Sequence, residues 1–547
     1  MGLSREAYRE LEDNVGQENI SDDPALCDAY AFQYLAETAR PAQSHFMPRP
    51  VAVLMPGTSE DVQAIVKTCN RHKIRVKPYS TGWYFFGAPQ KEGDDTVQLD
   101  LRRMDKILDI DERNMFAVVE PYVICANLQA EVMKVGLNLN ITGAGASTSP
   151  LASATSYLGS GPGTLWMGHN SDNLLALEWV MPTGEVLRTG SLGSGAGWFC
   201  GEGVGPSLRG LCRGVRGARG GMGVYTKAAL KLAPWNGPLQ LPIQGTIPAY
   251  SSPVPDNFRV YTVAFPSWPA YAEAHYKIYD NEIGYIAHRQ FNMMGADLAL
   301  AFWTMYMDPA KTLSDIEEIS KRPEVQDLIE ETRCSFQIIL AGRSLRDIDF
   351  QEKVLDQILV DTGGWKVSRM TGKDWAEFTF LYMIRWGHKA LNFAWAGGYL
   401  GSWSQKGTPD YVIQYQAIAE AAGYRDQKSG LLGQCGGDAM MGPASGVGGG
   451  GLTGFEQFVH YDPADKESVK AIVEHLHNAK TDATSHGFPP GKEDLYLKIG
   501  MTDDQLHQQY VNSGQPIVFH LQQKIKELLD PNSIGDRLYS CLPAEEK

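Results

Sequence analysis

The 547-residue chain lacks the features that define several common classes of protein. No segment approaches the roughly 18 consecutive apolar residues of a transmembrane helix, so no membrane partner is expected. Lys and Arg number 49 against 64 Asp and Glu, which leaves no cationic surface to collect the phosphates of a nucleic acid. The first residues, MGLSREAYRELED, carry charge where a signal peptide is apolar, and we predict a cytoplasmic protein.

Local metal and nucleotide motifs are also missing. The eight cysteines are scattered without a CxxC pair, which argues against zinc clusters, iron–sulfur ligation and a disulfide framework. No metal is therefore expected. Neither GxxxxGK[ST] nor a GxGxxG that opens a helix occurs, so the familiar phosphate-binding fingerprints are absent.

The sequence does contain the pattern of a multidomain α+β protein. Its length predicts two to four domains at roughly 100 to 200 residues each. Residues 58–74 have apolar positions at helical spacing after a capping Thr58. Residues 106–123 and 176–190 read as β-hairpins, and residues 125–136 as a helix that ends at a glycine. We expect a βαβ unit followed by antiparallel strands.

Two loops are rich in glycine and hydroxyl side chains. The stretch RVKPYSTGWYFFGAP at 75–89 places four consecutive aromatic residues between glycines, and residues 141–170 contain many glycines, serines and threonines. Backbone N–H groups in such loops approach phosphates closely because glycine has no side chain. Each loop alone is equally compatible with a buried structural turn.

Taken in order, these segments resemble the FAD-binding domain of the vanillyl-alcohol oxidase and p-cresol methylhydroxylase flavoprotein family. The resemblance runs through residues 49–234 and resumes at LQQKIKELLDPNSIG near the C-terminus. It implies a two-subdomain FAD-binding domain at 1–240, an α+β substrate-capping domain at 241–490, and a segment at 491–547 that returns to the FAD domain.

The resemblance also implies which residues bind FAD. The first loop would wrap the pyrophosphate, the second would follow the ribityl chain and flavin, and a third segment would lie beside the adenine half. The implied contacts are Pro78, Tyr79, Ser80, Thr81, Gly82, Trp83, Gly87, Ser149, Pro150, Ser153, Ser156, Gly159, Gly161, Gly223 and Val224. Trp83 stands near the position of a flavin-linked His in the berberine-bridge branch, and no cysteine occurs between 126 and 199. We therefore expect noncovalent FAD.

The family's substrate-binding motifs match less well. The Tyr-Arg pair of the phenol-oxidising branch is replaced in EDLYLKIGM, where strand alternation places Tyr496 and Lys498 on one face. Together they would stabilise a substrate oxyanion, although an ordinary solvated strand face fits the same pattern. Arg385 lies among aromatics, where an isolated charge needs a partner or a substrate. The hydroxy-acid branch's GHxGDGNxH is reduced to His460, and a lone histidine in a strand is more often a core residue than a ligand.

These features predict an FAD-dependent oxidoreductase that transfers hydride from a substrate C–H bond to flavin N5. Aromatic residues crowd the expected cap, which favours a para-substituted phenol or benzylic alcohol as the small aromatic substrate. Oxygen, a cytochrome or another flavoprotein would accept the electrons, and a homo-oligomer is expected from the resemblance. The alternatives are a D-lactate or glycolate type of 2-hydroxy-acid dehydrogenase, an electron-relaying flavoprotein subunit, and a relative that has lost its flavin.

Overall fold

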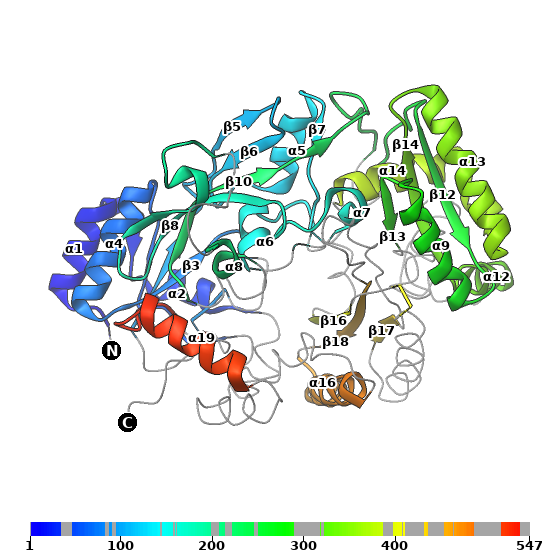
Figure 1. Ribbon diagram of the computed structural model, residues 1–547. Coiled ribbons are helices and arrows are strands. Elements are labelled where there is room, and N and C mark those ends of the chain that lie inside the picture. The colour runs from blue at the N-terminus through cyan, green and yellow to red at the C-terminus, as the bar shows by residue number, and fades with distance from the viewer. Residues whose placement is uncertain are drawn as a thin grey trace.

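A computed structural model of the chain shows N-terminal elements on one side and a second group of strands and helices on the other (Figure 1). The structure describes residues 2–33, 46–82, 87–89, 95–142, 145–156, 159, 161–198, 207–213, 221–245, 250–288, 318, 322–386, 398–406, 409–410, 432–435, 453–462, 464–485 and 516–536. Helices and sheets occur in both parts, which confirms the predicted α+β class.

The first sheet contains the predicted βαβ unit. Its four strands, in spatial order, are β1 (Ile20–Ser21), β2 (Ala52–Leu54), β4 (Thr96–Asp100) and β3 (Arg75–Tyr79). Strands β2, β4 and β3 run parallel, and α4 (Ser59–His72) connects β2 to β3. Thr58 accepts a hydrogen bond from the N3 amide of Asp61, whose carboxylate accepts one from the Thr58 amide. This capping box fixes the start of the predicted helix.

The second sheet is antiparallel throughout. Its strands, in spatial order, are β5 (Ile107–Asp111), β6 (Phe116–Val119), β10 (Val224–Lys231), β8 (Leu174–Val180) and β9 (Val186–Arg188). Strand pairs β5–β6 and β8–β9 confirm both predicted hairpins. The predicted helix after the first hairpin is α5 (Cys125–Met133), and a short ladder joins β7 (Leu137–Asn138) to β11 (Ala233–Pro234).

Short helices surround these sheets. They are α1 (Arg5–Val15), η1 (Gln17–Asn19), α2 (Pro24–Ala31), α6 (Pro150–Ser156), α7 (Thr164–Met167), η3 (Gly190–Leu192) and α8 (Arg209–Cys212). Helices α6 and α7 lie within the second glycine-rich stretch, so that stretch is partly helical and positions its loops by short helical turns.

The following part of the chain forms a third sheet covered by helices. Its strands, in spatial order, are β13 (Ile286–His288), β14 (Ser335–Ala341), β12 (Phe258–Ala264) and β15 (Trp365–Lys366). The helices are α9 (Trp268–Asp280), α12 (Pro323–Glu331), α13 (Leu345–Thr362) and α14 (Lys373–Arg385), with η7 (Ser368–Met370) before the last. Buried apolar residues of β12, β14, α9 and α13 share one core cluster.

A further sheet and two helices follow. The strands, in spatial order, are β16 (Gly398–Lys406), β18 (Thr453–Tyr461) and β17 (Leu432–Cys435), and the helices are α16 (Lys466–Ser485) and α19 (Pro516–Leu529). Helix α19, red in Figure 1, lies beside the N-terminal elements and far from α13. The chain therefore returns near its C-terminus to the part that contains the two glycine-rich loops.

Candidate functional site

The two glycine- and hydroxyl-rich loops meet in the structure. The backbone amide of Ser149 donates a hydrogen bond to Thr81 Oγ1 at 3.3 Å. These residues are 68 positions apart and follow different elements, since Thr81 comes after β3 and Ser149 precedes α6. The contact places the carboxyl end of a parallel strand beside the amino end of a short helix, where oriented N–H groups attract anions.

The first loop is fixed by the end of β3. The carbonyl of Tyr79 accepts from the amide of Leu101 at 2.9 Å, and Ser80 Oγ donates to the carbonyl of Pro121 at 2.5 Å. Gly82 adopts φ +70°, and a Cβ at this position would collide with the Tyr79 hydroxyl. Only glycine accommodates both the backbone conformation and the close approach.

The second loop is closed by hydrogen bonds to its own side chains. Ser149 Oγ accepts from the amide of Ala152 at 3.2 Å and caps α6. Asn170 donates through its side-chain Nδ2 to Ser153 Oγ at 2.6 Å and through its backbone N–H to the carbonyl of Gly159 at 3.2 Å. The bonds of Asn170 hold α6 and Gly159 against the segment that leads into β8.

Most hydroxyls in the two loops already donate to backbone carbonyls. Ser80 donates to Pro121, Ser153 to Pro150 at 3.0 Å, and Ser156 to Ala152. Thr81 and Ser149 differ because their hydroxyls accept from backbone amides, those of Ser149 and Ala152 respectively. Among the described residues, the hydroxyls of Ser80, Ser153 and Ser156 therefore hold the loops in shape, which leaves backbone N–H groups and the hydroxyls of Thr81 and Ser149 as donors for the phosphates.

Buried polar atoms without partners gather around the second loop. Asn140 Oδ1, His169 Nε2 and Ser171 Oγ make no hydrogen bond among the described residues. Asn140 Nδ2 donates to the carbonyl of Gly159 at 2.9 Å, so its amide faces this loop. A buried polar atom left unpaired is costly, and FAD, with polar groups on its ring, ribityl chain and phosphates, fits such a set of atoms.

Sequence reasoning did not single out these three residues. His169 is 4% exposed, and its Nδ1 lies 3.6 Å from Asp172 Oδ2. The neighbouring imidazole of His169 lowers the pKa of Asp172. Asn140 follows β7, while His169 and Ser171 lie between α7 and β8. Single polar residues in such connecting segments carry no periodic signal, so only the tertiary contacts identify them.

Arg385 ends α14 directly beside the second loop. Its Nη1 donates to the carbonyl of Ala126 at 3.2 Å, and the next residue, Trp386, accepts from the amide of Ala146 at 3.1 Å. Burial lowers the pKa of Arg385, and the electrostatic effect of Tyr250, which raises that pKa, is smaller. Its buried Nε has no acceptor, and no carboxylate pairs with the guanidinium, among the residues the structure describes. A substrate anion is a suitable partner for such a cation.

The remaining predicted FAD contacts are spread along neighbouring elements. Pro78 lies within β3, and Gly87 accepts through its carbonyl from Gln98 Nε2 at 2.9 Å. Gly223 adopts φ +95°, and Val224 begins β10. Within the described parts of the loops, no hydrogen bond joins Gly223 or Val224 to them, so the place of these two residues beside the adenine stays a prediction.

The other predicted catalytic residues are only partly described. His460 lies in β18, and its backbone pairs with Tyr399 of β16. Trp83, Tyr496 and Lys498 lie outside the described residues. Of the four predicted catalytic residues, the structure therefore places only the Arg385 side chain beside the loops.

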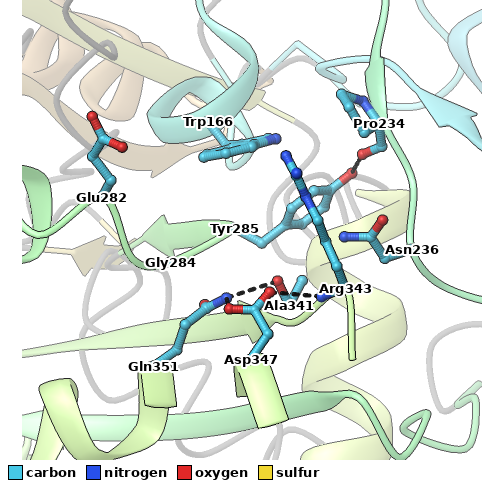
Figure 2. Close-up of a pocket in the computed structure, with 10 residues that line it drawn as sticks. All are labelled: Trp166, Pro234, Asn236, Glu282, Gly284, Tyr285, Ala341, Arg343, Asp347 and Gln351. Carbon is cyan, nitrogen blue, oxygen red and sulfur yellow. Dashed lines mark hydrogen bonds between the residues drawn. The ribbon is translucent and has the colours of Figure 1, made fainter. Parts of the chain in front are cut away.

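A separate pocket of about 260 Å³ lies where α7 and the end of β11 meet the third sheet and α13. Figure 2 shows Trp166, Tyr285 and Arg343 around it, and none of the predicted cofactor or catalytic residues lines it. Across the described ranges no group of three His, Cys, Asp or Glu residues is arranged to hold a metal ion. In the same part of the chain, no helix combines the length and apolarity needed to cross a bilayer.

Comparisons with known proteins agree with this geometry. Residues 50–190 match the FAD binding domain family. The chain is 30% identical over 240 residues, 42% of its length, to 1'-carboxy-chondrochloren decarboxylase of Chondromyces crocatus. It is 26% identical over 42% of its length to glycolate oxidase subunit GlcD of Bacillus subtilis. It is 31% identical over 34% of its length to the 4-cresol dehydrogenase [hydroxylating] flavoprotein subunit of Pseudomonas putida. The matches span 40%, 46% and 35% of these relatives.

Solved structures match over the whole chain. Substrate-bound p-cresol methylhydroxylase aligns with a TM-score of 0.72 at 18% identity, covering 100% of this chain and 99% of its own. The 4-ethylphenol oxidase of Gulosibacter chungangensis aligns with a TM-score of 0.70 at 20% identity and the same coverage. At these identities the match establishes the fold. Residues 50–190 are therefore an FAD-binding domain, in a chain whose fold is that of p-cresol methylhydroxylase.

Proposed function

We propose that the chain is an FAD-dependent oxidoreductase that oxidises a para-substituted phenol or benzylic alcohol. The observation that carries the proposal is the junction of Thr81 and Ser149, beside which lies the guanidinium of Arg385, without a carboxylate partner in the described part of the chain. When bound, FAD supplies the two-electron acceptor, flavin N5, for hydride from the substrate C–H bond. The domain division at residues 240 and 490 and the noncovalent attachment of FAD are parts of this proposal.

Arg385 has the clearest role in the proposed reaction. A phenol that loses its proton becomes a phenolate, and a buried cation favours that charged form. The same cation continues to stabilise the oxygen as the C–H bond breaks and charge is redistributed. Tyr496, Lys498 and His460 remain candidate partners for this oxygen. Oxygen, a cytochrome or another flavoprotein then takes the electrons.

A second candidate is oxidation of a 2-hydroxy acid. Two observations favour it, the match to a glycolate oxidase subunit and a guanidinium suited to binding a carboxylate. The described residues hold no metal-binding group for such an acid, so Arg385 would be its main anchor.

Anaerobic reduction of the purified protein tests these candidates. We expect 4-ethylphenol or 4-hydroxybenzyl alcohol to bleach the flavin absorbance bands, and D-lactate and glycolate to leave them unchanged. Bleaching by the acids alone would establish the second candidate. If dithionite reduces the flavin and none of the four compounds does, the chain is an electron-relaying subunit. A colourless protein that takes up no FAD would contradict the proposal altogether.

A further inference from the structure

The end of α19 is joined to the turn that precedes β10. Lys526 is 2% exposed, and its ammonium donates to the carbonyl of Gly221 at 2.5 Å across 305 residues of sequence. The same ammonium forms an ion pair with Asp530 at 2.6 Å. Gly221 adopts φ +65°, and a Cβ there would collide with the carbonyl of Asp536. The backbone at Gly221 is thus enclosed by the C-terminal segment.

The residues after α19 also bind β3. The amide of Val76 donates to the carbonyl of Ile534 at 2.7 Å, and the amide of Asp536 donates to the carbonyl of Val76 at 3.0 Å. Lys77 forms a buried ion pair with Asp536 at 2.6 Å. Strand β3 lies at one end of the first sheet, so this segment covers its open edge.

Asp530 connects the two attachments. One carboxylate oxygen accepts from the amide of Ile534 and the other from the amide of Gly535, both at 2.9 Å, while the second also pairs with Lys526. A carboxylate with three donors turns the chain sharply from α19 towards β3. We call residues 526–536 the C-terminal clasp.

The clasp therefore joins the two strands whose ends carry predicted FAD contacts. Strand β3 leads directly into Thr81 and Gly82, and the Gly221 turn leads into Gly223 and Val224. A buried ion pair often adds little net stability compared with apolar residues of the same size, whereas it does fix geometry. Neither ion pair of the clasp includes a residue of the two glycine-rich loops.

We propose that the C-terminal clasp sets the affinity for FAD, with Lys526 and Asp536 as positioning residues that hold the Gly221 turn and the end of β3 in register. The inference rests on the proposed function, because it takes both segments to be part of the FAD site. Loosening either tie lets one segment move relative to the other and weakens cofactor binding while the sheets stay folded.

The test compares three variants of the full chain. Lys526→Met removes the tie to Gly221, Asp536→Asn removes the charge that pairs with Lys77, and Lys524→Met changes an exposed lysine of the same helix as a control. The dissociation constant and release rate of FAD are measured by recovery of flavin fluorescence, and circular dichroism checks folding at the same temperature. Substrate turnover is not needed.

We expect Lys526→Met to raise the dissociation constant of FAD about tenfold or more, because losing a residue that supports the binding residues typically weakens binding by that much. Asp536→Asn should raise the constant less. Lys524→Met should match the parent. If Lys526→Met and Asp536→Asn both fold and bind FAD with the parent's dissociation constant, the inference about the clasp is overturned and the proposed function is not affected. If neither variant folds, the segment supports the fold and the inference fails. A parent protein that binds no FAD would instead contradict the proposed function.

Discussion

Arg385 is the residue with the most direct chemical consequence. Replacing it with Gln keeps a hydrogen-bond donor near Ala126 and removes the positive charge. We expect the rate of flavin reduction by the preferred phenol to fall on the order of 10²-fold, because a charge that stabilises the developing oxyanion is lost. Stopped-flow absorbance measures the rate, and FAD content should stay unchanged.

Lys373→Gln provides the matched control for this prediction. Lys373 begins the same helix, and its side chain is 82% exposed. The control should keep the parent rate. Equal rates in Arg385→Gln and the parent would show that this guanidinium does not face the substrate.

Gly161 tests the packing of the second loop. A Cβ at this residue would collide with the carbonyl of Ile141 and approach Asn140 Oδ1 at 2.9 Å. We expect Gly161→Ala to lower the free energy of unfolding by about 1 to 3 kcal/mol, as overpacking does, and to weaken FAD binding. Gly210→Ala is the control, since that glycine is exposed with open space around it. Urea unfolding of the parent and both variants measures the difference. If Gly161→Ala were as stable as the parent, the loop would relax freely around the added methyl group.

At the scale of elements, Glu178 of β8 joins three neighbours through one buried carboxylate. It accepts from Ser59 of α4 at 2.7 Å, from Lys227 of β10 at 2.8 Å and from Arg188 of β9 at 3.0 Å. Burial alone would raise the pKa of Glu178, but these donors outweigh it and hold the pKa at about 2. The ionised carboxylate is therefore favoured in the folded state.

The pKa of Glu178 sets the direction of a pH effect. Because the folded-state pKa lies below the ordinary value of 4.5, the stabilisation is present above that pH and is lost as pH falls towards 2. We expect Glu178→Gln to destabilise the protein at neutral pH. The variant should also lose less of its stability than the parent as the pH falls from 4.5 towards 2. Thermal unfolding across this pH range measures the stability of both proteins. Glu185→Gln, which changes an exposed neighbour, is the control. A parallel pH profile in Glu178→Gln and the parent would refute the assignment.

Local signals predicted elements better than they predicted the site. Thr58 and Asp61 mark the start of α4 in the sequence itself, because a capping box depends on residues three apart. The contact between Arg385 and Ala126 spans 259 positions, and no periodicity reports it. The loops around Thr81 and Ser149 were predicted by resemblance, whereas the unpaired atoms of Asn140 and His169 emerged only from tertiary packing.

At the scale of the molecule, the part that contains the two glycine-rich loops receives contacts from distant segments of the chain. Strand β3 receives its outer partner from residues near 535, while α14 reaches the second loop from the part that follows residue 250. A truncation before α19 therefore removes neighbours of Val76 and Gly221 that no earlier segment replaces in the described structure. This arrangement explains why the resemblance to flavoproteins resumes near the C-terminus after a long interruption.

The attachment of FAD is a property of the whole molecule and gives the last prediction. Cys69, Cys125 and Cys212 are buried, and burial raises the pKa of their thiols to about 12. Protonated buried thiols are poor nucleophiles towards a flavin. We expect acid precipitation of the yellow protein to leave the colour in the supernatant. A yellow pellet would show a covalent link, and His169→Ala would then test the buried Nε2 as its donor.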